Sequence, residues 1–93
     1  MNCSIALQIL PLTHPNRIVV IDDVIAFLQS QENVRVQVTP FETVLEGDFD
    51  TLMTMLKDAI SLAGKECDNI FANVKINYGN ILSIDEKLEK FSE

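Results

Sequence analysis

Apolar and polar residues alternate along four short segments of the chain, and this period of two is typical of β-strands with one buried face. The segments are residues 3–10 (CSIALQIL), 34–39 (VRVQVT), 41–47 (FETVLEG) and 70–78 (IFANVKINY). The alternation also predicts which residues share the apolar side of each strand: Ile5, Leu7, Ile9, Val34, Val36, Val38, Phe41, Thr43, Leu45, Ala72, Val74 and Ile76.

Two longer segments carry apolar residues at spacings of three and four, which line one side of a helix. Residues 16–31 are expected to bury a stripe formed by Ile18, Ile21, Val24, Ile25 and Leu28. Residues 48–65 are expected to bury Phe49, Leu52, Met53, Leu56, Ile60 and Ala63. Asn16 is the expected N-cap of the first helix, and Asp22 and Asp23 fall early in it, where a negative charge suits the helix dipole.

Residues that commonly begin or end helices mark the later elements as well. Gly47 and Asp48 predict a turn and an N-cap before the second helix, and Gly64 predicts its C-terminal cap. Near the C-terminus, Ser83 and Glu86 have the spacing of a capping box, which predicts a short third helix.

The predicted order of elements is β-α-β-β-α-β plus a C-terminal helix, within a single domain over residues 1–93. Strands with one apolar face and helices with one apolar stripe pack as two layers. The sequence therefore predicts an α+β protein of ferredoxin-like βαββαβ topology. In that fold both helices cover one face of a four-stranded antiparallel sheet, and the first and third strands are adjacent at its centre.

Composition and charge narrow the classes of partner. The chain has 14 Asp and Glu residues against 7 Lys and Arg, which gives a formal net charge of −7. Because the basic residues are scattered, phosphate backbones would be repelled and nucleic acid is not an expected partner. No run approaches the roughly 18 apolar residues of a membrane span, and the first residues lack the features of a secretory signal. We therefore expect a cytoplasmic protein without a membrane partner.

The sheet face opposite the helices is predicted to display small and polar side chains, namely Ser4, Ala6, Gln8, Val44, Glu46, Asn73, Lys75 and Asn77. Small apolar groups mixed with a few donors, acceptors and charges suit a partly desolvated pocket. Glu46 has two readings: a solvated carboxylate paired with Lys75, or an acceptor for a ligand that a second subunit covers. No aromatic residue stands at the outward central positions, unlike in RNA-binding domains of this fold.

Signals of catalysis or of a bound metal are missing from the sequence. It has no phosphate-binding glycine loop, no zinc-ligand spacing and no nucleophile with an evident base, so neither an enzyme nor a resident metal or cofactor is expected. Cys3 and Cys67 match no metal or redox spacing and are expected to be reduced, inert thiols. His14 is expected to be a loop imidazole, and Tyr78 to pack at a strand end.

Three blocks of the chain carry a resemblance to a known family: ILPL (9–12), TVLEGDFDTLM (43–53) and KINYGNILSIDEKLEKF (75–91). With these blocks and their spacing, the chain resembles the MTH1187/YkoF-like thiamine-binding proteins, formerly domain of unknown function 77, over essentially its whole length. The resemblance implies ferredoxin-like subunits, homo-oligomers built as dimers of dimers whose sheets pack together, and binding of thiamine or its pyrimidine precursors without chemistry upon them. Thr43, Glu46 and Gly47 carry over by position.

The leading hypothesis is a non-enzymatic protein that binds thiamine or a related hydroxymethylpyrimidine in vitamin salvage, storage or sensing. The candidate ligand-binding residues are Glu46, Thr43, Gln8, Ser4, Asn73 and Asn77. A carboxylate can accept from the ligand's amine or balance its thiazolium charge, and amides offer donors and acceptors, whereas Lys75 is a mismatch for a cation. Because a bare sheet cannot bury a ligand, a second subunit must cover it.

Two alternatives to this hypothesis stay open. The chain could be a structural or regulatory homo-oligomeric interaction module without a small-molecule ligand. It could also be a small enzyme acting on a pyrimidine.

Overall fold

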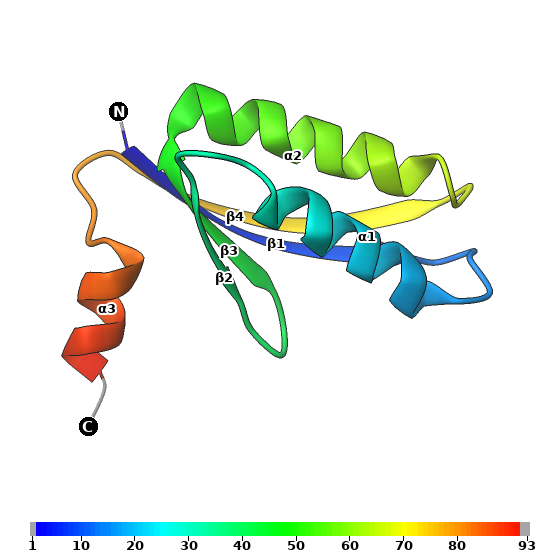
Figure 1. Cartoon of the computed structure of the whole chain (residues 1–93), viewed down its shortest axis with the longest axis horizontal. Coiled ribbons are helices and arrows are strands. Elements are labelled where there is room, and N and C mark those ends of the chain that lie inside the picture. Colours follow the sequence, from blue (N-terminus) through cyan, green and yellow to red (C-terminus); the bar gives the residue numbers. More distant parts are fainter. Residues whose placement is uncertain (1, 92–93) are drawn as a thin grey trace.

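The computed structural model describes residues 2–91, in which two helices cover one face of a four-stranded antiparallel sheet (Figure 1). The strands are β1 (Asn2–Pro11), β2 (Arg35–Val38), β3 (Thr43–Asp48) and β4 (Ile70–Tyr78), and the helices are α1 (Arg17–Gln29), α2 (Phe49–Gly64) and α3 (Ile84–Phe91). The strand order β2-β3-β1-β4 places β1 and β3 at the centre, so the predicted ferredoxin-like α+β fold is confirmed.

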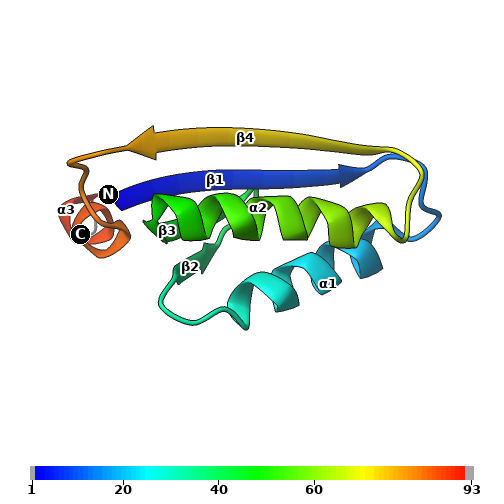
Figure 2. The same ribbon diagram turned by 90° about the horizontal axis from the view of Figure 1, so that it is seen from above.

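The third helix does not lie over the sheet with the other two. α1 and α2 run side by side over one face, whereas α3 lies beyond one end of the sheet, away from both of them (Figures 1 and 2). Gly79, with φ of +113°, follows β4 and lets the chain turn toward α3 in a conformation that side-chain-bearing residues rarely adopt. No helix among residues 2–91 is long and apolar enough to cross a bilayer.

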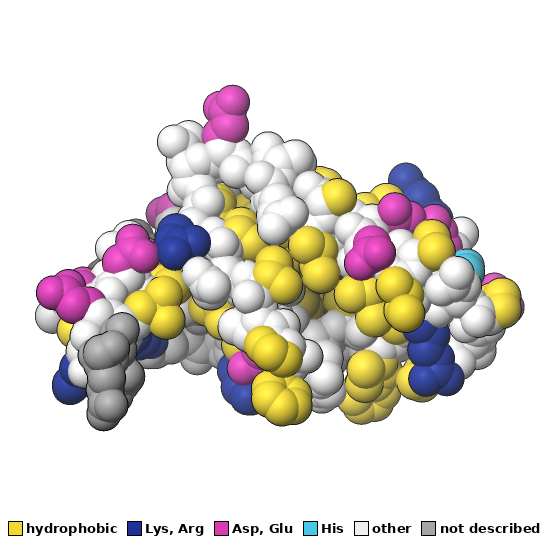
Figure 3. Space-filling model, turned by 60° about the horizontal axis from the view of Figure 1, so that its bottom comes forward, with side chains coloured by type: hydrophobic (Ala, Val, Ile, Leu, Met, Phe, Trp, Pro, Cys, Tyr) yellow, Lys and Arg dark blue, Asp and Glu magenta, His cyan; other side chains and the backbone are white. Residues whose placement is uncertain are grey.

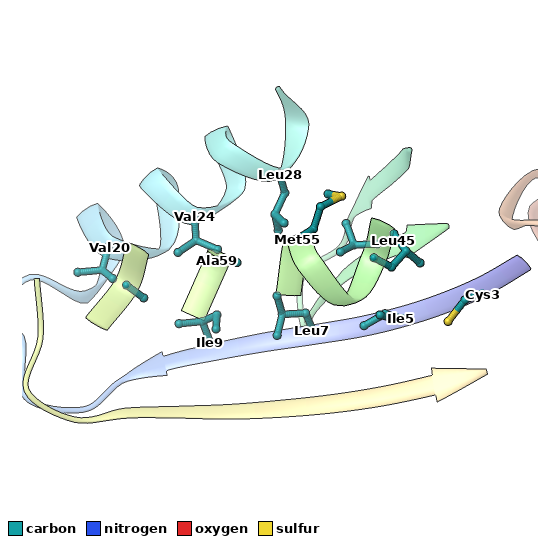
Figure 4. Packing of buried hydrophobic residues seen from close by; sticks show 12 residues of the cluster. Cys3, Ile5, Leu7, Ile9, Val20, Val24, Leu28, Leu45, Met55 and Ala59 are labelled. Atoms are coloured by element: carbon teal, nitrogen blue, oxygen red, sulfur yellow. The ribbon is translucent and has the colours of Figure 1, made fainter. Parts of the chain in front are cut away.

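The core lies between the sheet and the two covering helices (Figure 4). Strand register puts Ile5 opposite both Leu45 and Ile76, and Leu7 opposite both Thr43 and Val74. The buried cluster consists of Cys3, Ile5, Leu7, Ile9, Val20, Val24, Leu28, Leu45, Leu52, Met55, Ala59 and Ala63. The predicted alternation of β1 is therefore confirmed.

The predicted stripe of α1 is partly wrong. Ile18 is 70% exposed, and the buried residues of the helix are Val20, Val24 and Leu28. Most residues between 18 and 28 are apolar, so the spacing fits more than one face and tertiary packing selects among them. Asn16 is the N-cap residue, but its side chain makes no capping hydrogen bond, and Asp22 and Asp23 fall beyond the first turn because the helix begins at Arg17.

Three residues predicted to face the core from strands are also more exposed than expected. Phe41 is 83% exposed because β3 begins only at Thr43. Val38 is 40% exposed at the end of β2, and Ile76 is 51% exposed in β4, because both strands are edge strands. Gly47 forms no turn. It pairs with Cys3 inside β3, which runs directly into α2.

The caps of the later helices differ in how well they were predicted. Asp48 caps α2 as expected, accepting from the Thr51 N–H at 3.3 Å. The capping box of α3 is also confirmed: the Ser83 N–H donates to Glu86 Oε1 at 3.1 Å, and the Glu86 N–H donates to Ser83 Oγ at 3.0 Å. Gly64 is the last residue of α2 rather than its C-cap, which is Lys65 in right-handed helical conformation.

Replacing Asp48 with alanine should destabilise the protein at neutral pH but hardly at acid pH. The hydrogen bond from the Thr51 N–H lowers the pKa of the Asp48 carboxyl below its ordinary value. The stabilisation is therefore fully present above the pKa of the unfolded state, about 3.9, and is lost as the pH falls through the lower folded-state pKa. Thermal melts of wild type and variant across this range measure the gap, with Asp50→Ala in the same helical turn as the control. A gap that does not narrow with acid would contradict the assignment.

Candidate functional site

The open face of the sheet, meaning the face opposite α1 and α2, carries three rows of side chains set by the strand register. The first row is Asn77, Ser4, Glu46 and Arg35, the second is Lys75, Ala6, Val44 and Gln37, and the third is Asn73 and Gln8. Figure 3 brings this side forward and shows hydrophobic side chains gathered across its middle. Five of the six predicted ligand-binding residues therefore share one face, as the alternation predicted.

The first row is occupied by the chain's own C-terminal segment. The Ile84 N–H at the start of α3 donates to Glu46 Oε2. Arg35 Nη2 lies 3.2 Å from Asp85 Oδ1, and the Ile84 side chain is only 6% exposed. Glu46 thus accepts a hydrogen bond at the positive end of α3, where a carboxylate is favoured by the unpaired backbone N–H groups and the helix dipole.

The second row does not contain the ion pair that one reading of Glu46 required. Lys75 Nζ lies 3.5 Å from Glu42 Oε2, not beside Glu46, and the lysine side chain stays 77% exposed. The cation that looked mismatched with thiamine is therefore partly balanced by a carboxylate of the same chain. Ala6 and Val44, which lie between the edge strands in this row, are half-buried.

The third row supplies an amide pair. Asn73 Nδ2 donates to Gln8 Oε1 at 3.1 Å, which leaves the Gln8 amide N–H groups and the Asn73 carbonyl oxygen available. Gln8 lies four positions after Ser4 on β1, a distance of about 13 Å in an extended strand. One aminopyrimidine ring therefore cannot contact both the first and the third rows of the same copy.

Thr43 is the predicted site residue that the structure does not bring to the open face. It is 7% exposed and lies on the helix-covered side with Leu45, opposite Leu7 in register. There it lines a pocket of about 220 Å³ between α1 and the turn from β2 to β3. Sequence reasoning missed this pocket; the signal for it was Pro40, which interrupts the alternation between residues 39 and 41.

His14 and the cysteines have local structural roles. The His14 Nδ1 atom accepts from the Asn16 N–H at 2.9 Å and so closes the loop before α1. Both thiols are free and buried, and burial raises the pKa of the Cys3 thiol. Burial alone would raise the pKa of Cys67 too, but hydrogen bonds, first from Thr13, lower it. Among residues 2–91 no group of three His, Cys, Asp or Glu side chains could hold a metal ion.

Comparison with known proteins adds a family match to this geometry. Residues 5–92 match the family described as thiamine-binding protein. A Clostridium perfringens relative, UPF0045 protein CPE1503, is 34% identical over an alignment of 93 residues that covers 96% of each chain. The crystal structure of protein SP2199 from Streptococcus pneumoniae is 68% identical, with a TM-score of 0.85 and coverage of 96% of this chain and 99% of that one.

A more distant solved structure shares the fold. It is that of TM0486 from Thermotoga maritima, whose description refers to thiamine biosynthesis/salvage. The two chains are 22% identical, with a TM-score of 0.87 and coverage of 98% and 99%. At this identity the similarity supports only a shared fold.

Proposed function

Because this chain belongs to the thiamine-binding protein family, we propose that it binds thiamine or a related hydroxymethylpyrimidine in the cytoplasm without transforming it, for vitamin salvage, storage or sensing. The observation that carries the proposal is the make-up of the open face. It sets an amide pair, Gln8 and Asn73, beside the half-buried Ala6 and Val44. Such a surface combines hydrogen-bonding groups with apolar area that a covering molecule would desolvate.

The ligand is enclosed when a second copy packs its open face against the first. A two-fold axis that lies between the two sheets and runs along the middle row sets the first row of each copy against the third row of the other, because a two-fold interface uses the same surface twice. Each site then draws Gln8 and Asn73 from one copy and Ser4, Glu46 and Asn77 from its partner. Two such dimers make the tetramer.

The ligand's chemistry suits this shared site. The aminopyrimidine ring has a donor amine beside ring-nitrogen acceptors, and amides such as Gln8 and Asn73 can match both. The permanently cationic thiazolium is attracted by the Glu42 carboxylate of one copy and by the Glu46 carboxylate of the other. The net charge of −7 also favours a cationic ligand.

Complementation between two weakened variants tests the shared site. Gln8→Ala and Glu46→Gln should each lower thiamine affinity at least tenfold, about 1.4 kcal/mol, as homo-oligomers. When the two variants are unfolded and refolded together, each mixed dimer carries one site with both substitutions and one site with neither. Titration calorimetry of the mixture should therefore recover wild-type affinity at up to half of the mixed dimers' sites.

The control is Gln29→Ala, an exposed residue at the end of α1, which should bind like wild type. If the wild-type protein binds thiamine but the refolded mixture recovers no wild-type affinity, the whole site lies within one copy. If an oligomeric wild-type protein gives no binding heat up to millimolar thiamine, the result would favour the interaction module. Conversion of the ligand on incubation would favour the enzyme.

A further inference from the structure

The third helix carries an apolar side chain that its own chain leaves half uncovered. Ile84 and Leu88 are four residues apart and therefore share one face of α3. Ile84 is 6% exposed where the helix begins on the sheet, whereas Leu88, one turn later, is 49% exposed. Of residues 84–90, Ile84 alone is buried. A helix of eight residues is too short to be stable without packing, and its own sheet packs only against its first turn.

The turn between β2 and β3 carries a second exposed apolar side chain. Phe41 is 83% exposed, the highest fraction among the large hydrophobic residues of 2–91. The turn itself is held by hydrogen bonds: the Thr39 N–H donates to the Glu42 carbonyl at 3.0 Å, and Thr39 Oγ1 accepts from the Glu42 N–H at 3.1 Å. The exposed phenylalanine is therefore presented by an ordered turn.

The helix and this turn stand at opposite ends of β3. α3 begins against Glu46, near the end of the strand, and the turn precedes Thr43, its first residue. Figures 1 and 2 show α3 running away from the sheet on the side opposite α1 and α2. Because the five positions from Phe41 to Glu46 span about 17 Å of extended chain, α3 leaves Phe41 of its own copy uncovered.

The two-fold arrangement proposed above brings the helix of one copy to the turn of the other. Its axis reverses β3 of the second copy, so the end of β3 that carries α3 faces the end that carries the turn in the partner. Packed sheets lie about 10 Å apart, and eight helical residues extend about 12 Å, so α3 is long enough to reach the partner's turn. The same relation applies to both copies, and each dimer contains the contact twice.

The charges of the two segments are compatible with this contact. Two acids of α3, Asp85 and Glu86, are already engaged within the chain, by the ion pair to β2 and by the capping box. The remaining charges of the helix are two lysines and one glutamate, which sum to a positive charge. Its last turn carries Lys90, and the turn between β2 and β3 carries the Glu42 carboxylate, so the two segments attract rather than repel each other.

We propose that α3 of each copy packs on the β2–β3 turn of a second copy, with Leu88 covering Phe41, an inference that rests on the two-fold site of the proposed function. Enclosing the two side chains together removes apolar surface from water on both copies. The contact also closes the outer end of the shared site, because α3 begins at Glu46 and Glu42 of the turn reaches the open face at Lys75.

Disulfide trapping in the full chain tests the contact. The double variant Phe41→Cys/Leu88→Cys should become a covalent dimer on mild oxidation, because two cysteines can bond when their Cα atoms lie within about 7 Å. Peptide mapping should find the bond between positions 41 and 88. The matched control is Phe41→Cys/Ser61→Cys, whose second thiol lies on the exposed side of α2. This control and the wild type, in which Cys3 and Cys67 are buried, should give no such dimer.

A single substitution gives a second measurement without added thiols. Leu88→Asp places a charge against the phenyl ring and near the Glu42 carboxylate of the partner, so it should weaken dimerisation at least tenfold in sedimentation equilibrium. Val19→Asp, at a position 45% exposed on α1, is the control and should dimerise like wild type. Circular dichroism checks that both variants are folded.

The outcomes separate this contact from the proposed function. If the wild type dimerises and binds thiamine, but the double variant forms no bond and folded Leu88→Asp dimerises normally, the contact is wrong and the shared site stands. If the covalent dimer forms but the wild type binds neither thiamine nor hydroxymethylpyrimidine, the contact stands and the ligand is wrong. A monomeric wild type would overturn the contact and the shared site together. The disulfide decides the matter even if Leu88→Asp fails to fold.

Discussion

Replacing Leu45 with alanine should lower the free energy of unfolding by about 3 kcal/mol. Leu45 is fully buried, stands in register between Ile5 and Val36, and belongs to the cluster that joins the sheet to both covering helices. Truncating a buried leucine loses its transfer free energy and leaves a cavity, which together cost about 2.7–5.0 kcal/mol in measured series. Urea denaturation followed by circular dichroism, at one fixed protein concentration, gives the difference.

The matched control for Leu45→Ala is Leu88→Ala on α3. Leu88 is 49% exposed, so the same substitution removes far less buried area and should cost under about 1 kcal/mol. Equal losses at the two positions would mean that β3 does not hold the centre of the core.

Replacing Glu46 with alanine should release α3 from the sheet while leaving the sheet folded. The helix has eight residues, which is too short to be stable alone, and its first N–H donates to the Glu46 carboxylate. Losing a hydrogen bond to a charged group costs about 1.5–3 kcal/mol, which corresponds to a gain of about 10- to 150-fold in helix opening. Hydrogen exchange should therefore quicken by that factor in the backbone amides of α3, and not in those of β1 and β4.

Two further variants isolate the cause of this change. Glu46→Gln retains a side-chain oxygen that can accept from the Ile84 N–H, so α3 should keep most of its protection. Glu89→Ala removes an exposed carboxylate from the same helix and should change exchange little. If Glu89→Ala speeds exchange as much as Glu46→Ala, the anchor lies in the helix itself and not in the sheet.

Strands with alternating polarity were predictable because each residue of the pattern has only two possible faces. The assignments of Ile5, Leu7 and Ile9 to the core and of Gln8 and Asn73 to the other face are confirmed on that basis. The buried face of α1 was not predictable to the same degree, because several faces of that helix are apolar. The buried face of α1 is selected by its packing against the sheet and α2, and these contacts between distant segments are not evident from one sequence.

The candidate site was predictable only where it depends on local alternation. The hydrogen bond between Glu46 and Ile84 joins residues 38 positions apart, and the residues next to each of them give no sequence signal for it. The alternation assigned Thr43 to the apolar side of β3, and the structure confirms that side; the pocket that Thr43 lines was not predictable, because the alternating pattern says nothing of where β3 leaves β1.

Pairing between β1 and β3 stops at Leu7, so the main chain of Ile9 has no partner in β3 although its side chain packs in the core. An alanine scan would therefore report Ile9 as a packing residue and overlook any recognition made there. A change to the peptide linkage itself is required, such as an ester in place of the Ile9 amide by chemical synthesis, which deletes one donor and keeps every side chain.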